Sequence, residues 1–390
     1  MKKLIALLLC ALMCLSFVAC DENVDTKTPS GGESTVEDGG STSDDTTNEN
    51  DSANSTDTHT HAFGEWSVTR EATTSREGEE TRSCSCGETE KRAIAKTFSS
   101  GFSYEVNADG TSCTITGIGT CTDIRINMPE TIDGYTVTKI GNNAFYDCKS
   151  IRKIILPNTI TEIGSTAFYA CTAIDEIILP EGLETIGSSA FSICISLTGI
   201  RIPENVKTIE GGAFAFCSSL MEVCNDSELE IVLGAEDNGA LGYYAKNIYP
   251  SQEPASKLVE VDEFVFYNDN GKYLLVGYKG EDDHLVLPET VNGQSYAIAD
   301  LSFSYIKWLK SMVIPEGVTE IGFAVFFESE GIETITIPKS VTTIGENALA
   351  GCERLTDIYY AGSETEWQNI GYPNAYNELE GKNIHYNHAD

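Results

Sequence analysis

The chain has 390 residues, enough for two or three domains of ordinary size, and 41% of them are hydrophobic, so part of the chain can build a core. Acidic residues outnumber basic residues by 60 to 25, which gives a formal net charge of −35. Nucleic-acid binding needs clustered Lys and Arg, and no basic patch is present, so the composition argues against a nucleic-acid partner.

The N-terminus, residues 1–20, is predicted to be a secretory signal peptide. Two lysines precede an apolar run, 4–19, which is too short to span a bilayer comfortably. The run ends in "FVAC", which resembles a bacterial lipobox, although Phe17 stands where leucine is usual. This resemblance implies lipidation of Cys20 and anchoring at the outer face of the bacterial cell membrane. Ordinary cleavage and uncleaved anchoring are the alternatives.

Residues 21–58 contain eleven acidic residues, one lysine and almost no apolar side chains. Such a segment cannot bury enough surface to offset its chain entropy, so we expect a disordered acidic linker. It could tether the folded part to the membrane, or it could be a tail without a role.

Residues 59–97 alternate apolar and polar side chains in two strand-like runs, with Gly78 between them. Trp66, Val68 and Ile94 are the apolar members of this pattern. The pattern favours a small β module built on a hairpin.

Four side chains in this module suggest zinc: His59, His61, Cys84 and Cys86. The Cys-x-Cys spacing is tighter than usual, and the fourth ligand would have to be a neighbouring histidine. The stretch resembles modules of Gram-positive surface proteins that read "HxFGxW…EATC…C…CG", but Thr74 stands where those carry a cysteine. The favoured interpretation is therefore a β module without a cofactor, and a zinc site on His61, Cys84 and Cys86 is the alternative.

A period of 23 residues runs through most of the remaining chain. The fragments "AFYDC", "AFYAC", "AFSIC" and "AFAFC" begin at residues 144, 167, 190 and 213. Prolines recur at the same spacing: Pro157, Pro180 and Pro203, then Pro315 and Pro338. A period in the twenties with a Leu/Ile-x-x-Ile-x-Ile skeleton is typical of a leucine-rich-repeat solenoid. We therefore predict a mostly β solenoid in two arrays, preceded by the disordered tether and the small β module.

Within each unit, alternating Ile and Leu residues should point inward, and proline should end the strand because it cannot donate to the next coil. Glycines such as Gly164 and Gly187 are expected to permit a tight corner. The phenylalanines that follow are expected to stack as a buried spine. They are Phe145, Phe168, Phe191, Phe214 and Phe326.

The repeated cysteines form a predicted column of structural thiols: Cys148, Cys171, Cys194, Cys217 and Cys352. Equivalent side chains of stacked coils point the same way, which argues against both disulfides and a convergent metal site. Ser329 and Ile306 occupy the equivalent place in other coils, so we predict a small buried packing slot. Whether Cys113 and Cys121 pair is left open.

Two array starts are visible, because the segment after residue 102 is repeated after residue 262. The first array is expected at 102–250, ending in a strand and a short helix as a cap. Residues 251–261 are expected to be a linker, and 262–388 a second array that Trp367 closes as a lid.

The phrase "IPxxVTxIGxxAFxxCxxLxxIxIP" resembles the BspA-like class of bacterial leucine-rich repeats, over about three quarters of the chain. The resemblance implies a curved solenoid on a secreted or surface protein, in a class associated with adhesion to host matrix proteins or to other cells. It does not identify the ligand.

No catalytic motif is present, so an enzyme is not expected. Binding would use the outward strand positions, of which neighbouring Ile155 and Ile178 could mark a contact site or be ordinary strand filler. The candidate face comprises Lys153, Ile155, Glu176, Ile178, Arg201, Val313, Thr336 and Tyr359.

Three functions are consistent with the sequence. The favoured one is cell-surface recognition or adhesion, with a protein partner on host matrix or another cell and a membrane contact through the N-terminal lipid. A structural envelope spacer and a glycan-binding surface lipoprotein are the alternatives. Oligomeric state, and whether the two arrays form one continuous curve, are left open.

Overall fold

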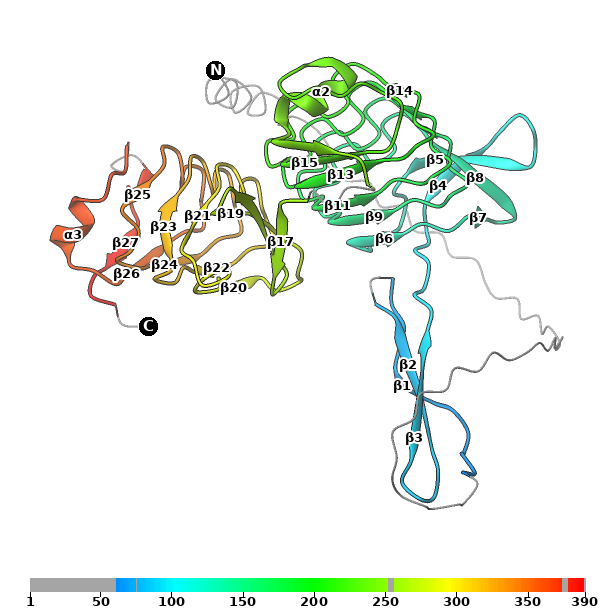
Figure 1. Ribbon diagram of the computed structural model, residues 1–390, viewed down its shortest axis with the longest axis horizontal. Helices are drawn as coiled ribbons and strands as arrows, with labels where there is room; N and C mark the ends of the chain where they lie inside the picture. Colours follow the sequence, from blue (N-terminus) through cyan, green and yellow to red (C-terminus); the bar gives the residue numbers. More distant parts are fainter. Residues whose placement is uncertain (1–60, 75, 252–255, 374–377, 389–390) are drawn as a thin grey trace, which may run out of the picture. The chain divides into compact units, whose positions relative to one another are not determined.

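The computed structural model describes residues 61–74, 76–251, 256–373 and 378–388 (Figure 1). The predicted signal peptide with Cys20, the predicted acidic linker and His59 lie outside these ranges. The described part is mostly β and forms a solenoid with a period of about 23 residues, as the sequence predicted. No helix in the described part is long and apolar enough to cross a membrane.

The N-terminal module is a three-stranded antiparallel sheet rather than a simple hairpin. Its strands are β1 (Ser67–Arg70), β2 (Gly78–Ser83) and β3 (Thr89–Ile94). Gly78 does not lie between two strands but opens β2. A side chain there would be blocked, because a Cβ would lie 2.6 Å from the backbone nitrogen of Ala72.

The first array carries a seven-stranded ladder along one long side of the coils, which begins with an antiparallel hairpin, and two separate three-stranded parallel ladders along the opposite side. The ladder that continues from the hairpin contains β4 (Ser103–Val106), β5 (Ser112–Gly117), β7 (Thr131–Ile132), β8 (Tyr135–Ile140), β10 (Glu162–Ile163), β12 (Thr185–Ile186) and β14 (Thr208–Ile209). The opposite side contains β6 (Arg125–Asn127), β9 (Lys153–Ile155), β11 (Glu176–Ile178), β13 (Gly199–Ile202), β15 (Glu222–Asn225) and β16 (Asn247–Tyr249).

The second array has one continuous ladder along each side. One ladder contains β17 (Leu258–Val261), β18 (Phe264–Asp269), β19 (Lys272–Tyr278), β21 (Tyr296–Ile298), β23 (Val318–Ile321) and β25 (Thr343–Ile344). The other contains β20 (His284–Val286), β22 (Ser311–Val313), β24 (Thr334–Ile337), β26 (Asp357–Tyr360) and β27 (Asn383–His385).

The expected linker is shorter than predicted. Leu258–Val261 is β17, which pairs antiparallel with β18 and so belongs to the second array. The sequence did not show this because β17 stands outside the 23-residue repeat. Among the described residues, no strand of the first array pairs with a strand of the second, so the strand ladders are not continuous between the arrays.

The phenylalanine spine is present in the core. The rings of Phe145, Phe168, Phe191 and Phe214 are fully buried and stack at centroid distances of 5.0, 5.1 and 5.1 Å. In the second array Phe303 lies 6.1 Å from Phe326. Stacking one large apolar side chain per coil removes it from water and fixes the spacing of the coils.

The repeated glycines act by allowing close approach, not by adopting an unusual turn conformation. Neither Gly187 nor Gly345 has a positive φ. A Cβ on Gly187 would lie 2.6 Å from the backbone nitrogen of Ser165, and one on Gly345 would lie 2.5 Å from the backbone of Gly322. The chain does turn at these glycines, since Ala190 N–H donates to the Gly187 carbonyl and Ala348 N–H to the Gly345 carbonyl, but the missing side chain is needed for the contact between neighbouring coils.

Caps close the ends of both arrays. A short helix, α2 (Asp237–Tyr244), follows the last coil of the first array, and a Cβ on its Gly239 would collide with the Ala213 side chain. The second array ends with α3 (Glu364–Gln368), whose Trp367 packs on the core, 5.1 Å from the ring of Tyr360. These caps cover apolar coil ends that would otherwise face water.

Candidate functional site

The outward face arises from the alternation within each strand of the ladder that contains β6, β9 and β11. In β9 and β11 the middle isoleucine is buried, and the residues on either side of it point outward. The pairing register aligns Lys153 with Glu176 and Ile155 with Ile178. The structure therefore brings these four predicted residues together as two adjacent rows.

The polar row is satisfied within the protein. The Lys153 Nζ atom lies 2.7 Å from the Glu176 carboxylate, and both side chains are half-buried. Further along, the buried Glu222 carboxylate accepts hydrogen bonds from the Ser256 hydroxyl at 2.6 Å and the Asn247 amide at 3.0 Å. The charges of Lys153, Glu176 and Glu222 are thus paired or hydrogen-bonded within the protein.

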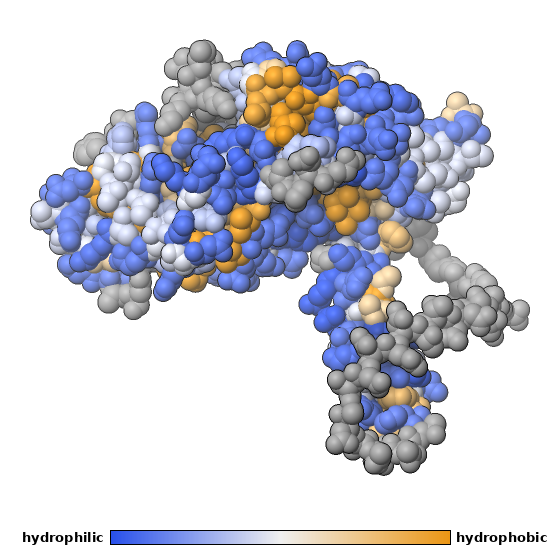
Figure 2. All heavy atoms as spheres, viewed as in Figure 1, coloured by the Kyte–Doolittle hydropathy of each residue, from blue (hydrophilic) through white to orange (hydrophobic). Residues whose placement is uncertain are grey.

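The apolar row of the first array is open to solvent. Ile155 is half-buried and Ile178 is 42% exposed. Arg201 belongs to the predicted face, but the hydrogen-bonded register does not extend from Ile178 to Arg201, because β11 and β13 are not hydrogen-bonded to each other. The exposed Arg201 side chain instead forms ion pairs with Glu181 and Asp226. Figure 2 shows separate apolar patches near β9 and near α2.

The second array carries a matching row with one residue per coil. Its register aligns Val286, Val313, Thr336, Tyr359 and His385. Val286 is 67% exposed, whereas Val313, Thr336 and Tyr359 are half-buried. The Tyr359 ring stacks on His385 at 4.7 Å. Val286 and His385 were absent from the predicted face, but aligning "LVLP" with the "IILP" of other coils would have found Val286.

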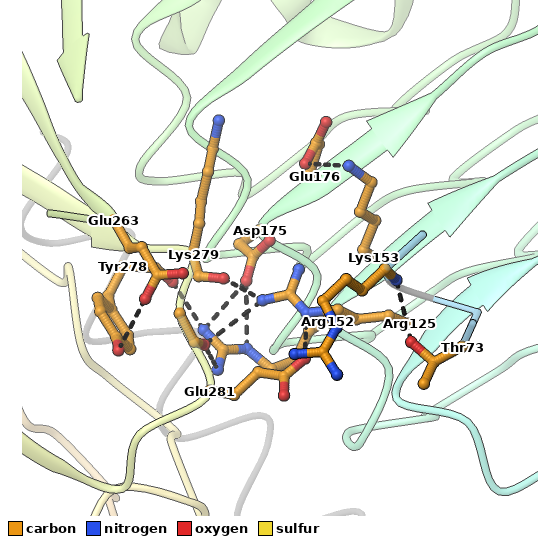
Figure 3. Close-up of polar contacts among 12 residues, drawn as sticks. Thr73, Arg125, Arg152, Lys153, Asp175, Glu176, Glu263, Tyr278, Lys279 and Glu281 are labelled. Carbon is orange, nitrogen blue, oxygen red and sulfur yellow. Dashed lines mark hydrogen bonds and ion pairs between the residues drawn. The ribbon is translucent and has the colours of Figure 1, made fainter. Parts of the chain in front are cut away.

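A buried arginine joins the two arrays (Figure 3). Arg152 donates to the backbone carbonyls of Tyr278, at 2.7 Å, and Gly280, and its guanidinium lies 4.3 Å from the Trp308 ring. It also pairs with Asp175 at 3.1 Å, and both side chains are about 5% exposed. Arg125 adds a hydrogen bond to the Lys279 carbonyl. No periodic signal in the sequence indicates these contacts.

Burial decides the titration of this ion pair. Desolvation raises the pKa of Asp175 to about 6, although Arg152 opposes the shift. Desolvation also lowers the pKa of Arg152. Both pKa shifts have the same cause. The attraction between the two charges does not fully offset the free energy that each charge loses when it is removed from water.

Apolar side chains complete the joint beside the arginine. Met221 of the first array clusters with Val265, Tyr267, Val276 and Ala299 of the second. The first-array residue Gly199 makes room for β17, because a Cβ there would lie 3.2 Å from the Leu258 side chain. An open cavity of about 210 Å³ lies at this break between β11 and β13.

The cysteine column consists of free thiols. Cys171, Cys194, Cys217 and Cys352 are buried, and Cys148 in the first coil is half-buried. Each buried thiol donates to a phenylalanine carbonyl of the preceding coil, at distances of 3.0 to 3.3 Å. Ser329 makes the equivalent bond to Phe303 at 2.6 Å. The slot is therefore a donor position as well as a small packing space. Cys113 and Cys121 are also free.

The structure brings the three predicted metal ligands of the N-terminal module together. The ligand atoms of His61, Cys84 and Cys86 all lie within 4.8 Å of one another. A hydrogen bond from the backbone of Cys86 and others from the Cys86 thiol and His61 lower the pKa of the Cys84 thiol to about 6. Cys84 is buried, whereas His61 and Cys86 are exposed.

The stacked parallel coils define a leucine-rich-repeat solenoid. A family model described as the BspA type leucine rich repeat region matches residues 125–233 and 284–384, in six copies that span more than half of the chain. The chain belongs to this family, as the motif resemblance indicated. A search of curated proteins returned no match.

Several solved structures are similar. A leucine-rich cell surface protein from Faecalibacterium prausnitzii is 24% identical, with coverage of 71% of this chain and 98% of that chain and a TM-score of 0.27. A leucine-rich-repeat protein from T. pallidum is 22% identical, with coverages of 69% and 92% and a TM-score of 0.31. The pneumococcal vaccine antigen PcpA is 17% identical, with coverages of 75% and 98% and a TM-score of 0.28.

Proposed function

We propose that the protein is a non-enzymatic recognition or adhesion solenoid of the bacterial cell surface, held there by a lipid on Cys20. Its partner is a protein of host matrix or of another cell. Membership of a repeat family that is generally non-enzymatic supports the first part of this proposal. The signal-like N-terminus and the lipobox-like "FVAC" support the second.

One observation supports the binding face most strongly. Ile178 and Val286 are exposed on hydrogen-bonded strands, beside the half-buried residues Ile155 and Val313 in the same rows. The neighbouring polar row has its charges paired internally. Apolar side chains held on a rigid scaffold and flanked by satisfied polar groups are what a protein partner can desolvate at low cost.

A protein ligand fits these rows better than a glycan. Glycan binding would favour exposed aromatic rings, but the only aromatic residue among the eight predicted face residues is Tyr359. Its ring is half-buried and contacts His385 and His388, each at 4.7 Å. A spacer without a ligand is the remaining alternative, since the rows could also be ordinary strand surface.

Binding measurements on the full chain test the proposal. Purified host matrix proteins and bacterial surface proteins are immobilised one by one, and saturable binding is sought by interferometry. For any ligand found, Ile178→Lys and Val286→Lys should each weaken binding by about 10- to 100-fold, since burying one such side chain contributes about 1.5–3 kcal/mol.

The matched control is Leu233→Lys. Leu233 is 53% exposed but lies outside the strand rows. An equal loss of affinity in the control would indicate that the interface does not lie on the rows. A complete absence of saturable ligands would favour the spacer.

A further inference from the structure

The N-terminal module lacks a hydrophobic core. Among the described residues of the module, 61–74 and 76–97, only Gly78 and Cys84 are buried, and none belongs to the three core clusters. The guanidinium groups of Arg82 and Arg92 lie over the Trp66 ring, 4.7 and 4.4 Å from its centroid, and Trp66 is not packed in an interior. A module of fewer than about 40 residues usually needs a disulfide or a metal to remain folded.

The turn between β2 and β3 presents both thiols on the same side as His61. The backbone N–H of Gly87 donates to the Cys84 carbonyl at 3.0 Å, and the φ of +97° at Gly87 allows this tight turn. Phe63 forms a β-bridge with Cys84, and the Gly64 N–H donates to the Ser83 carbonyl at 3.0 Å. The pairing of Phe63 and Gly64 with Cys84 and Ser83 places the segment that begins at His61 beside the turn.

The three ligand atoms are already close to metal-binding geometry. The His61 Nδ1 atom lies 3.1 Å from the Cys86 Sγ atom, and all three ligand atoms are within 4.8 Å of one another. Around a tetrahedral Zn²⁺, with bonds of about 2.1 Å to nitrogen and 2.3 Å to sulfur, ligand atoms lie roughly 3.5–3.8 Å apart. Shifts of about 1 Å or less would bring the triad to that spacing.

We propose that His61, Cys84 and Cys86 bind one Zn²⁺ ion, which holds the segment before β1 against the β2–β3 turn. One imidazole and two thiolates form a donor set that suits zinc better than hard cations such as Ca²⁺ or Mg²⁺. Binding releases the remaining thiol protons to solvent. His61 and Cys86 are exposed, so the fourth position of the tetrahedron is open to water or to a further ligand.

This proposal reverses the interpretation favoured by the sequence, which was a module without metal. The tight Cys-x-Cys spacing had argued against zinc when only the linear pattern was considered. Both cysteines are free thiols, so no disulfide bond between them stabilises the module in this structure.

The test uses the full chain, purified under reducing conditions, loaded with zinc and dialysed against metal-free buffer. Elemental analysis should find about one zinc per chain. Cobalt substitution should give a thiolate-to-metal charge-transfer band in the near ultraviolet together with the visible bands of tetrahedral Co²⁺. Cys84→Ser, Cys86→Ser and His61→Ala should each weaken zinc affinity at least about 10-fold.

Cys224→Ser is the matched control, because Cys224 is a half-buried free thiol outside the module. It should keep the full zinc content and the cobalt spectrum. Hydrogen exchange gives a second readout, in which zinc should slow exchange at 61–64 and 83–88 and leave the solenoid unchanged. Zinc content near zero, zinc retained in both cysteine variants, or a Cys84–Cys86 disulfide in the protein isolated without reductant would each overturn the proposal.

Discussion

The thiol column offers a test in which two explanations predict opposite orders of stability. Cys194 is fully buried and donates to the Phe168 carbonyl at 3.3 Å. Burial raises the pKa of its thiol well above the usual range, so the donor proton is present at any ordinary pH. Cys194→Ala removes this donor and leaves a void, whereas Cys194→Ser keeps a donor.

The expected magnitudes follow from those two contributions. The lost hydrogen bond costs about 1 kcal/mol, and the void costs about another 1 kcal/mol. Cys194→Ala should therefore lower the free energy of unfolding by about 2 kcal/mol. Cys194→Ser should cost only about 0.5–1 kcal/mol, because a hydroxyl can make the same bond, as Ser329 does to Phe303.

Urea unfolding followed by circular dichroism measures the difference, with the same two substitutions at the half-buried Cys224 as controls. If the slot were only a small apolar space, the serine hydroxyl would be buried without a partner at a cost of about 1–3 kcal/mol. The serine variant would then be the less stable of the two. That order would refute the donor role.

Substitutions at three further positions test the core, the joint and the turns. Phe191→Ala removes a ring from the middle of the stack and should cost about 3–5 kcal/mol in urea unfolding, with Phe191→Leu clearly milder. The raised pKa of Asp175 adds stability that is fully present below the unfolded value of 3.8 and is lost as pH rises through about 6. The stability difference between wild type and Asp175→Asn should therefore shift in favour of wild type on acidification from pH 7 to pH 4, and a flat difference would contradict the shift. Ser189 has a φ of +54°, a conformation that Asn143 and Asn347 adopt in other coils. Ser189→Asn should therefore increase the free energy of unfolding by about 0.5 kcal/mol and raise the melting temperature. A lower melting temperature would argue against backbone strain at this position.

The features that repeat every 23 residues could be predicted from the sequence. Each coil presents the same inward residues to its neighbours, so the period alone places Phe168 over Phe145 and aligns Ile178 with Ile155. Burial of equivalent apolar side chains is cooperative along the stack, which is why a simple pattern predicts it well.

Contacts that occur once could not be predicted in this way. Arg152 meets the carbonyl of Tyr278 across 126 positions of sequence, and no neighbouring coil repeats that pairing. The thiol donors were missed for another reason, since a cysteine pattern shows side-chain size but not which carbonyl lies opposite. The triad at Cys84 depends on a β-bridge from Phe63, which a short, largely polar module does not indicate.

Photo-crosslinking at the strand rows tests the recognition face most directly. A photoreactive amino acid is placed at Ile178, at Val286 and, as control, at Leu233, and the displayed full-length protein is irradiated in contact with purified host matrix proteins or with other bacterial cells. We expect a crosslinked protein, the same one from both row positions and none from the control. Crosslinks of equal yield at Leu233, or none at either row position, would contradict it.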